Sequence, residues 1–224
     1  MADLRVYRIP FSTNVDRIAM AAAFKDLDVE WIDVDPDDRA PVREVSGQEL
    51  VPVAVDPVDG TVVGDSPRIL EWIEQRWPRP SLWPDDPGAA ALADVFCRRF
   101  NDVWKGPPNR MTALLEPVDL DRERLSEADR RAVDDDAARM RIWLDRFEER
   151  LVDREFLGDD QLGICDVTAY PFLRYGRQPL PPEDGHAFHR VLATYGAFDA
   201  TSHPRLTAWC VRVHERFPKI TWPR

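Results

Sequence analysis

The sequence predicts two domains of different class, an α/β domain followed by an all-helical domain, and three observations support this prediction. In the first third of the chain, β-rich runs alternate with apolar residues at helical spacing. Residues 78–88 contain four prolines and a glycine, which cannot continue a helix. Beyond them the apolar residues recur at helical spacing only. We therefore expect domains at residues 1–78 and 89–224, joined by a linker at residues 79–88.

The first domain is expected to hold a small mixed sheet with helices packed on it. Residues 35–46 are polar and irregular, with room for one short helix. Helices are expected on two apolar stripes, namely Val15, Ile18, Ala19 and Ala22, and Ile69, Trp72, Ile73 and Trp77. Strands are expected at residues 4–7, 29–34, 52–55 and 61–63, with a hairpin connection between the last two.

The second domain is expected to contain five helical segments. Ser126 to Asp129 resembles a capping box, with Asp in place of Glu, and would start a long helix. Two further segments are expected at residues 166–175 and 186–196. The first, long and last helices show apolar stripes, namely Leu92, Val95, Phe96, Phe100, Val103 and Trp104; Val133, Ala137, Met140, Leu144, Phe147 and Leu151; and Leu206, Trp209, Cys210, Val213 and Phe217.

Composition excludes several classes of function. A net charge of −11 disfavours nucleic acid as a partner. The chain has no run of 18 apolar residues and no signal-peptide pattern at its start, so we expect neither a membrane span nor secretion. Its three cysteines are widely spaced without a CxxC motif, which fits the reduced cytoplasm. His186 and His189 lack further ligands nearby in the sequence, so we expect no metal site.

A candidate binding site lies at residues 51–67. Pro52 heads an apolar strand, where it gives up a ladder donor, and this placement suits a cis peptide bond after Val51. Ser66 is expected to be the N-cap of a helix, with Pro67 at its first position. The N–H groups of a helix start bind anions, so an extended, carboxylate-bearing molecule such as a peptide-like thiol would fit. A plain capping role for Ser66 is the competing interpretation.

Four segments together resemble the cytosolic glutathione transferases, whose thioredoxin-like domain precedes an all-helical domain. Residues 7–15 look like the active-site turn of that family, and residues 47–53 are similar to its cis-proline strand. Asp65-Ser66 matches the pair that opens its third helix. Residues 156–166 resemble its helical-domain turn, in which Asp166 would take a structural capping role although Gly163 stands where Ser or Thr is usual.

The resemblance implies that glutathione, or another low-molecular-weight thiol, binds to the first domain as co-substrate. The backbone of Val51, which precedes Pro52, would pair with the cysteinyl unit. Asp65 would hold the ammonium group and Ser66 the carboxylate of the γ-glutamyl end. Gln48 would add a polar contact, or else be a solvated loop residue.

The catalytic hydroxyl has two possible placements. Matching Tyr7 to Ser12 against a Tyr-x-x-Pro-x-Ser pattern puts Ser12 at the catalytic position, with Thr13 and Tyr7 as further candidates. Counting back from Val15 without gaps puts Ile9 there, and Ile9 cannot stabilise a thiolate. We favour Ser12, although it could equally be the N-cap of the first helix. Tyr7 is expected to be a strand residue packed in the core.

The implied function is an enzyme that joins a small thiol to an apolar electrophile. The alternative is a non-catalytic binding protein or a scaffold on the same fold. The resemblance also implies a homodimer. An acceptor pocket lined by Trp104, Arg110, Met111 and Tyr175 is a further expectation.

Overall fold

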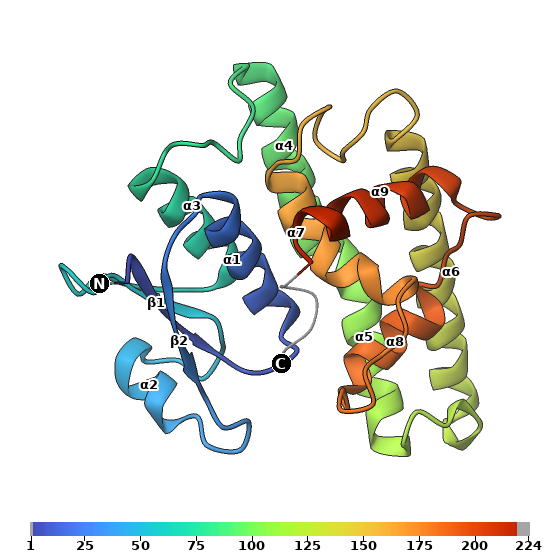
Figure 1. Cartoon of the computed structure of the whole chain (residues 1–224). Helices are drawn as coiled ribbons and strands as arrows, with labels where there is room; N and C mark the ends of the chain where they lie inside the picture. The colour runs from blue at the N-terminus through green and yellow to red at the C-terminus, as the bar shows by residue number, and fades with distance from the viewer. Residues whose placement is uncertain (1, 219–224) are drawn as a thin grey trace. The chain divides into compact units, whose positions relative to one another are not determined.

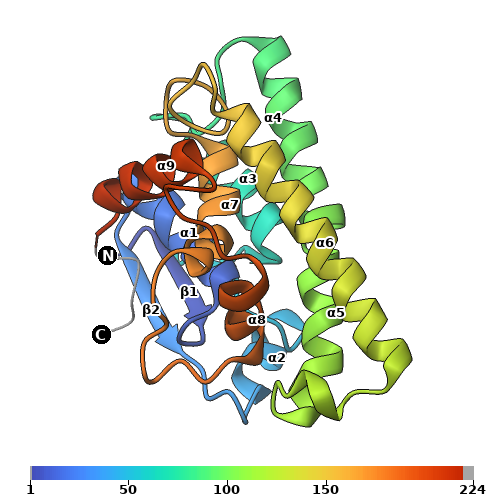
Figure 2. The same ribbon diagram turned by 90° about the vertical axis from the view of Figure 1, so that its right-hand side faces the viewer.

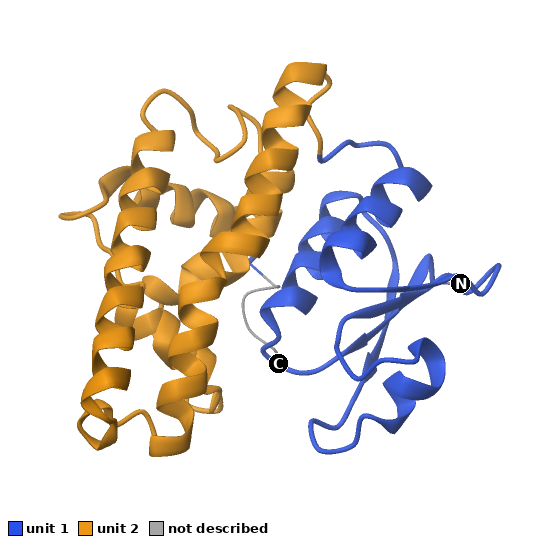
Figure 3. Cartoon of the chain, turned by 180° about the vertical axis from the view of Figure 1, so that it is seen from behind, with its two compact units in different colours: residues 1–82, 217–224 blue, residues 83–216 orange. Residues whose placement is uncertain are grey.

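The computed structural model describes residues 2–218. The chain forms two compact units, residues 1–82 with 217–224, and residues 83–216 (Figure 3). Among the described residues, no helix is both long enough and apolar enough to cross a membrane. Each unit is considered by itself below.

The first unit is built on a four-stranded mixed sheet with the strand order β2-β1-β3-β4. The central strand β1 pairs in parallel with β2 and antiparallel with β3, which in turn pairs antiparallel with β4. All four predicted strands are therefore confirmed, within one or two residues at their ends. Their bounds are β1 Leu4–Arg8, β2 Val29–Asp33, β3 Val53–Val55 and β4 Val62–Gly64.

Helices cover both faces of this sheet (Figure 1). Helix α1 (Thr13–Phe24) packs against α3 (Ser66–Arg76), while α2 (Ala40–Ser46) lies on the other side of the strands in Figure 1. Strand residues alternate between the two faces. Tyr7 and Val53 contribute to the cluster that includes Val42 of α2, whereas their neighbours Val6 and Ala54 are fully buried on the opposite face.

The segment after α3 is attached to the first unit by a buried ion pair. Lys25 Nζ lies 2.8 Å from a Glu74 carboxylate oxygen and donates to the carbonyls of Trp77 at 2.7 Å and Pro80 at 2.5 Å. Glu74 also accepts from the backbone of Leu82, which is buried. These bonds explain why the first unit extends as far as Leu82.

The second unit is helical in all its regular elements, in agreement with the prediction. Its long helix α6 is capped by Ser126, whose Oγ accepts from the Asp129 N–H at 3.1 Å and donates to the Asp129 carboxylate at 2.7 Å. The N-cap role of Ser126 is thus confirmed, while the Asp129 carboxylate bonds to the Ser126 hydroxyl rather than to the backbone N–H that a capping box requires. The elements are α4 Pro87–Arg99, the π-helical η1 Phe100–Trp104, α5 Gly106–Leu115, the short η2 Glu116–Val118 and η3 Arg122–Arg124, α6 Glu127–Arg150, α7 Ile164–Leu173, η4 Arg174–Gly176, α8 Ala187–Tyr195 and α9 Pro204–Arg216.

The core of the second unit surrounds α7, in which all ten residues are buried. The Asp166 carboxylate accepts from the N–H groups of Leu157 at 2.8 Å and Gly163 at 3.0 Å, and from Trp209 Nε1 at 2.7 Å. Because Gly163 has no side chain, the Asp166 N–H bonds to the Gly163 carbonyl instead, at 3.1 Å. The structural role expected for Asp166 is therefore confirmed.

The first apolar stripe of this unit is only partly buried, contrary to expectation. Phe100 and Trp104 stack in the core with ring centroids 4.4 Å apart. Leu92, Val95 and Val103 are instead 66%, 49% and 49% exposed. Leu92 and Val95 border a hollow between α4 and α6, which run side by side in Figure 2, and Val103 borders a second hollow that η1 and α5 form with α6. The prediction failed because α4 and η1 present apolar residues both to the core of the unit and to its surface.

Candidate functional site

The N-termini of α1 and α3 meet in the first unit. Asn14, in the first turn of α1, accepts a hydrogen bond at 3.2 Å from the Oγ of Ser66, the first residue of α3. The Arg17 guanidinium donates to the same Ser66 oxygen at 3.2 Å and to Asn14 Oδ1 at 3.4 Å. Two helix starts and a guanidinium group therefore lie within hydrogen-bonding reach of one another. Each of these features carries positive potential, so together they favour an anion.

The turn into α1 is tight. The Ser12 N–H donates to the Ile9 carbonyl at 3.3 Å, which closes a four-residue turn. Pro10 occupies the second position, and Phe11, at the third, has a φ of 63°. This is the pattern of a type II β-turn, in which the third residue is usually glycine. A bulky residue with positive φ costs about 1 kcal/mol or more, and such conformations concentrate at functional sites.

The structure places the candidate hydroxyl residues at this turn. Ser12 is the N-cap of α1, and its Oγ accepts from the Val15 N–H at 3.4 Å. Thr13 follows as the first helical residue and is buried. Tyr7 is a partly buried strand residue against the core, as expected. Ile9 is also in that core, with 6% of its surface exposed, so it presents no polar group.

The strand edge beside this turn has the expected backbone geometry. The peptide bond between Val51 and Pro52 is cis. Val51 precedes the paired residues of β3, which begin at Val53. Gln48 lies across the end of β4, where a Cβ on Gly64 would be 2.2 Å from Gln48 Nε2. That nitrogen is buried and makes no hydrogen bond to the described residues. Gln48 is therefore packed rather than solvated, with a donor still available.

The prediction that Ser66 caps α3 is wrong. Asp65 occupies the N-cap position with a φ of 71°, and Ser66 is the first helical residue. The Ser66 side chain bonds to α1 instead of to its own helix, because Asn14 lies within reach of it. Asp65 is exposed, so its carboxylate is available to a cation, and its positive φ is a second strained conformation at this location.

Sequence reasoning missed Asn14 and Arg17. Arg17 is fully buried, and arginine is rarely buried without partners. Its burial was not readable from periodicity, because α1 is buried on several sides, with Thr13, Val15, Ile18 and Met20 all enclosed. The three-residue spacing of Asn14 and Arg17 is the signal that places them on one helix face.

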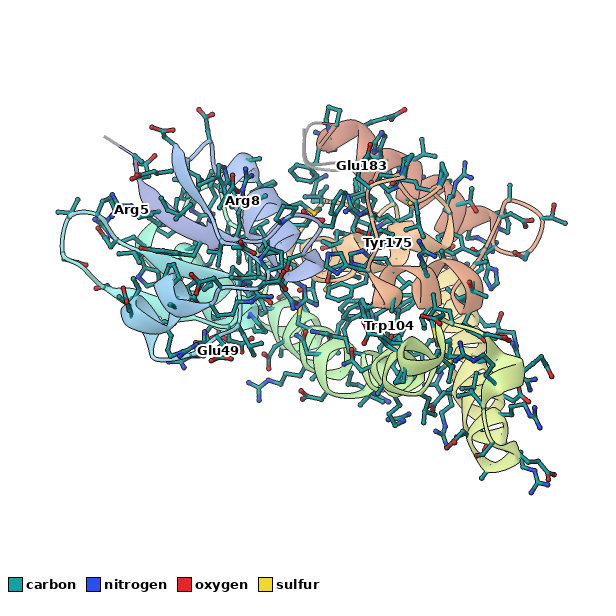
Figure 4. The ribbon with its side chains drawn as sticks, turned by 90° about the horizontal axis from the view of Figure 1, so that it is seen from below. Arg5, Arg8, Glu49, Trp104, Tyr175 and Glu183 are labelled. Carbon is teal, nitrogen blue, oxygen red and sulfur yellow. The ribbon has the colours of Figure 1, made fainter. Side chains whose placement is uncertain are left out.

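Three of the four residues expected to line an acceptor pocket are buried in the helical unit, and the fourth, Arg110, borders a hollow beside α6. Trp104, Met111 and Tyr175 are at most 2% exposed, and Figure 4 shows Trp104 and Tyr175 within the helical unit. Arg110 forms a two-pronged ion pair with Asp136 at 2.6 and 2.9 Å. The prediction is therefore wrong for Trp104, Met111 and Tyr175, which pack in the core of the second unit. No cluster of three or more metal-ligating side chains occurs among residues 2–218.

Family models match both units of the chain. The model of the glutathione S-transferase N-terminal domain matches residues 6–81, and that of the C-terminal domain matches residues 107–216. A probable glutathione S-transferase of Nicotiana tabacum is 24% identical over 169 residues, which cover 75% of this chain and 69% of that protein.

Solved structures show the same fold. The Tau class glutathione S-transferase of mango, Mangifera indica, superposes with a TM-score of 0.75 at 18% identity and covers 99% of this chain and 93% of its own. Rice GST1, solved in complex with glutathione, gives a TM-score of 0.74 at 23% identity, with coverage of 99% and 92%. The two domain matches together span most of the sequence, and the chain therefore belongs to the cytosolic glutathione S-transferase family.

Proposed function

We propose that this protein is a glutathione transferase that joins the thiol of glutathione, or of another low-molecular-weight thiol, to an apolar electrophile. The observation that carries the proposal is the meeting of two helix N-termini in the first unit of a chain of this family. Such a site suits a ligand with both a carboxylate and a thiol that reacts as an anion. The three free cysteines support the cytoplasm as its location.

The thiol ligand would lie along the edge before β3. The backbone of Val51 would pair with the cysteinyl unit, with the cis Val51–Pro52 bond orienting that edge. The exposed Asp65 carboxylate would hold the ligand's ammonium group, and the N–H groups at the start of α3 would hold its carboxylate. The Gln48 amide nitrogen is buried against Gly64, so it would add a polar contact only after its side chain turns outward.

Ser12 is the hydroxyl that we propose stabilises the thiolate. A serine hydroxyl has one O–H donor and two acceptor lone pairs. Accepting the Val15 N–H therefore leaves the Ser12 proton free to bond to sulfur. A free thiol has a pKa of about 8.5, so a donor and the α1 N-terminus together would raise the thiolate fraction at neutral pH. Holding the electrophile beside this thiolate would then supply the rest of the rate increase.

A non-catalytic binding protein is the second candidate. It is favoured by the burial of Ile9, which takes the catalytic position in the ungapped placement. In that case Ser12 would serve only as the cap that the structure shows. The protein would still bind a thiol, but it would not accelerate conjugation.

Two substitutions of Ser12 distinguish capping from catalysis. Ser12→Ala removes both the cap and the hydroxyl, and loss of a cap costs about 1 kcal/mol of stability. Ser12→Gly removes the hydroxyl but costs the cap only a few tenths of a kcal/mol. If the hydroxyl stabilises the thiolate, both variants lose about 10²-fold or more in kcat/KM, and Ser12→Thr recovers part of it.

The assay uses an aryl halide with glutathione, after a thermal-shift panel of several low-molecular-weight thiols has identified the one that stabilises the protein. A Ser12→Gly variant with the wild-type rate would refute the catalytic assignment. A wild-type protein that binds a thiol without any conjugation would support the second candidate.

We also propose that the chain is a homodimer that associates through the hollow between α4 and α6. This hollow has a volume of about 650 Å³, and its apolar lining includes Leu92 and Val95. Its lining also carries four arginines, Arg99, Arg146, Arg150 and Arg154, against one acidic residue, Glu149. Residues 1–82 of a second copy would complement this net positive lining, because they contain sixteen Asp and Glu against nine Lys and Arg.

Sedimentation of the purified protein tests the dimer. We expect a dimer at micromolar concentration and a shift toward monomer in Leu92→Asp. Val211→Asp, at an exposed apolar position of α9 outside the hollow, is the matched control and should stay dimeric. A wild-type monomer, or a dimer unaffected by Leu92→Asp, would contradict the proposal.

A further inference from the structure

Arg17 is a fully buried arginine directly behind the start of α3. It belongs to α1, and its guanidinium hydrogen bonds reach both Asn14 of its own helix and Ser66 of α3. Ser66 and Asn14 are themselves hydrogen-bonded, so the three side chains close a ring across the two helices. Ser66 is only 2% exposed and Arg17 is fully buried, so this ring is enclosed within the first unit.

The chemistry of the ring determines the direction of each bond. A guanidinium group only donates, so Asn14 must present its carbonyl oxygen to Arg17. The Ser66 hydroxyl, which contacts that same oxygen, must then be the donor to it. Ser66 has a single proton, and its lone pairs accept the N–H of Arg17. The proton of Ser66 is therefore directed into the protein and not toward a ligand.

The direction of the Ser66 proton determines which groups at the start of α3 can donate to an anion. While the ring is closed, the Ser66 hydroxyl cannot donate to a ligand carboxylate. The backbone N–H groups at the start of α3 remain as direct donors. Behind them lies the charge of Arg17, which is retained at any physiological pH because the guanidinium group does not deprotonate. A buried charge is screened less than an exposed one, so it acts strongly on a carboxylate in front of it.

We infer that Arg17 is a positioning residue of the thiol site: it holds Ser66 in place and supplies the positive charge that selects a ligand bearing an α-carboxylate. This inference rests on the proposed function, since it concerns the γ-glutamyl end of the same ligand. Arg17 does not touch the ligand. It acts through Ser66 and the start of α3.

The test compares glutathione with its analogue in which the γ-glutamyl α-carboxylate is an amide. Titration calorimetry measures the affinity of both for the wild-type protein and for Arg17→Met, Arg17→Lys and Asn14→Asp. Arg17→Met should weaken glutathione about 10-fold or more and the amide less than 2-fold. Asn14→Asp, which offsets the charge but keeps Arg17, should do the same. Arg17→Lys should retain most of the preference for the carboxylate.

Each result decides the question. Equal losses for the two ligands would show a packing role and overturn the inference, as would unchanged affinities. A wild-type protein that binds both ligands equally would overturn the inference while leaving the proposed function standing. A wild-type protein that binds neither would overturn both. If circular dichroism shows that Arg17→Met does not fold, Asn14→Asp and Arg17→Lys carry the test.

Discussion

Replacing Lys25 with Met should strongly destabilise the first unit. The Lys25 side chain is fully buried, and its Nζ makes three contacts of 2.5 to 2.8 Å, to the Glu74 carboxylate and to two carbonyls. Met is similar in length but cannot donate, so a carboxylate and two carbonyl oxygens lose their partner. Removing one member of a buried ion pair typically costs about 3 to 5 kcal/mol.

The lower end of that range applies here. Glu74 is 17% exposed and also accepts from Ser81 Oγ at 2.7 Å, so its charge keeps some stabilisation. We therefore expect a loss of about 3 kcal/mol, against a total stability of about 5–15 kcal/mol for a typical protein. Urea unfolding monitored by tryptophan fluorescence measures this loss. Trp72 and Trp77, whose ring centroids lie 5.5 Å apart, contribute to the signal from the same unit.

Two further variants serve as controls for Lys25→Met. Arg43→Met breaks an ion pair with Glu49 in which both side chains are more than half exposed, so it should cost less than about 1 kcal/mol. Glu74→Gln in the Lys25→Met background removes the uncompensated charge and should recover part of the loss. The reasoning is refuted if Lys25→Met costs no more than Arg43→Met.

The second unit should show two opposing pH dependences. Burial lowers the pKa of His189 from 6.5 to about 4, so the unfolded chain binds more protons between these values, and stability is lost as the pH falls through that window. Burial raises the pKa of Asp166 from 3.8 to about 6, so here the folded state binds more protons, and stability is lost as the pH rises from about 4 to 6. At about 1.4 kcal/mol per pKa unit, the effect is at most about 3.5 kcal/mol for His189 and about 3 kcal/mol for Asp166. Urea unfolding from pH 4 to 7 checks both. The stability advantage of wild type over His189→Gln should grow as the pH rises, and the advantage over Asp166→Asn should shrink. A growing advantage over Asp166→Asn would mean that the three N–H donors outweigh burial.

Local patterns predicted the elements well because their causes are local. The strands of the first unit follow from short β-rich runs, and the N-cap at Ser126 bonds to Asp129, three residues further along the chain. The cis bond at Pro52 was expected from a proline at the head of a strand. In each case the residues concerned are neighbours in the chain, so the sequence contains the whole interaction.

Apolar periodicity was less reliable for burial. It correctly placed Phe100 and Trp104 in the core of the second unit. It failed for Leu92 and Val95, because periodicity reports which residues share a helix face but not what covers that face. The hollow between α4 and α6 depends on the packing of two helices that the sequence does not relate.

By itself the sequence determined the α/β class of the first unit and the helical class of the second, the order of the elements in the first unit, and the segments that carry the glutathione transferase resemblance. It missed α5. The tertiary structure decided how the site is held together. Asp65, not Ser66, occupies the N-cap position of α3, and Ser66 bonds to Asn14 from 52 residues earlier in the chain. Arg17 reaches the same serine across 49 residues. Such hydrogen bonds exist only after the sheet has brought α1 and α3 together, and no local pattern encodes them.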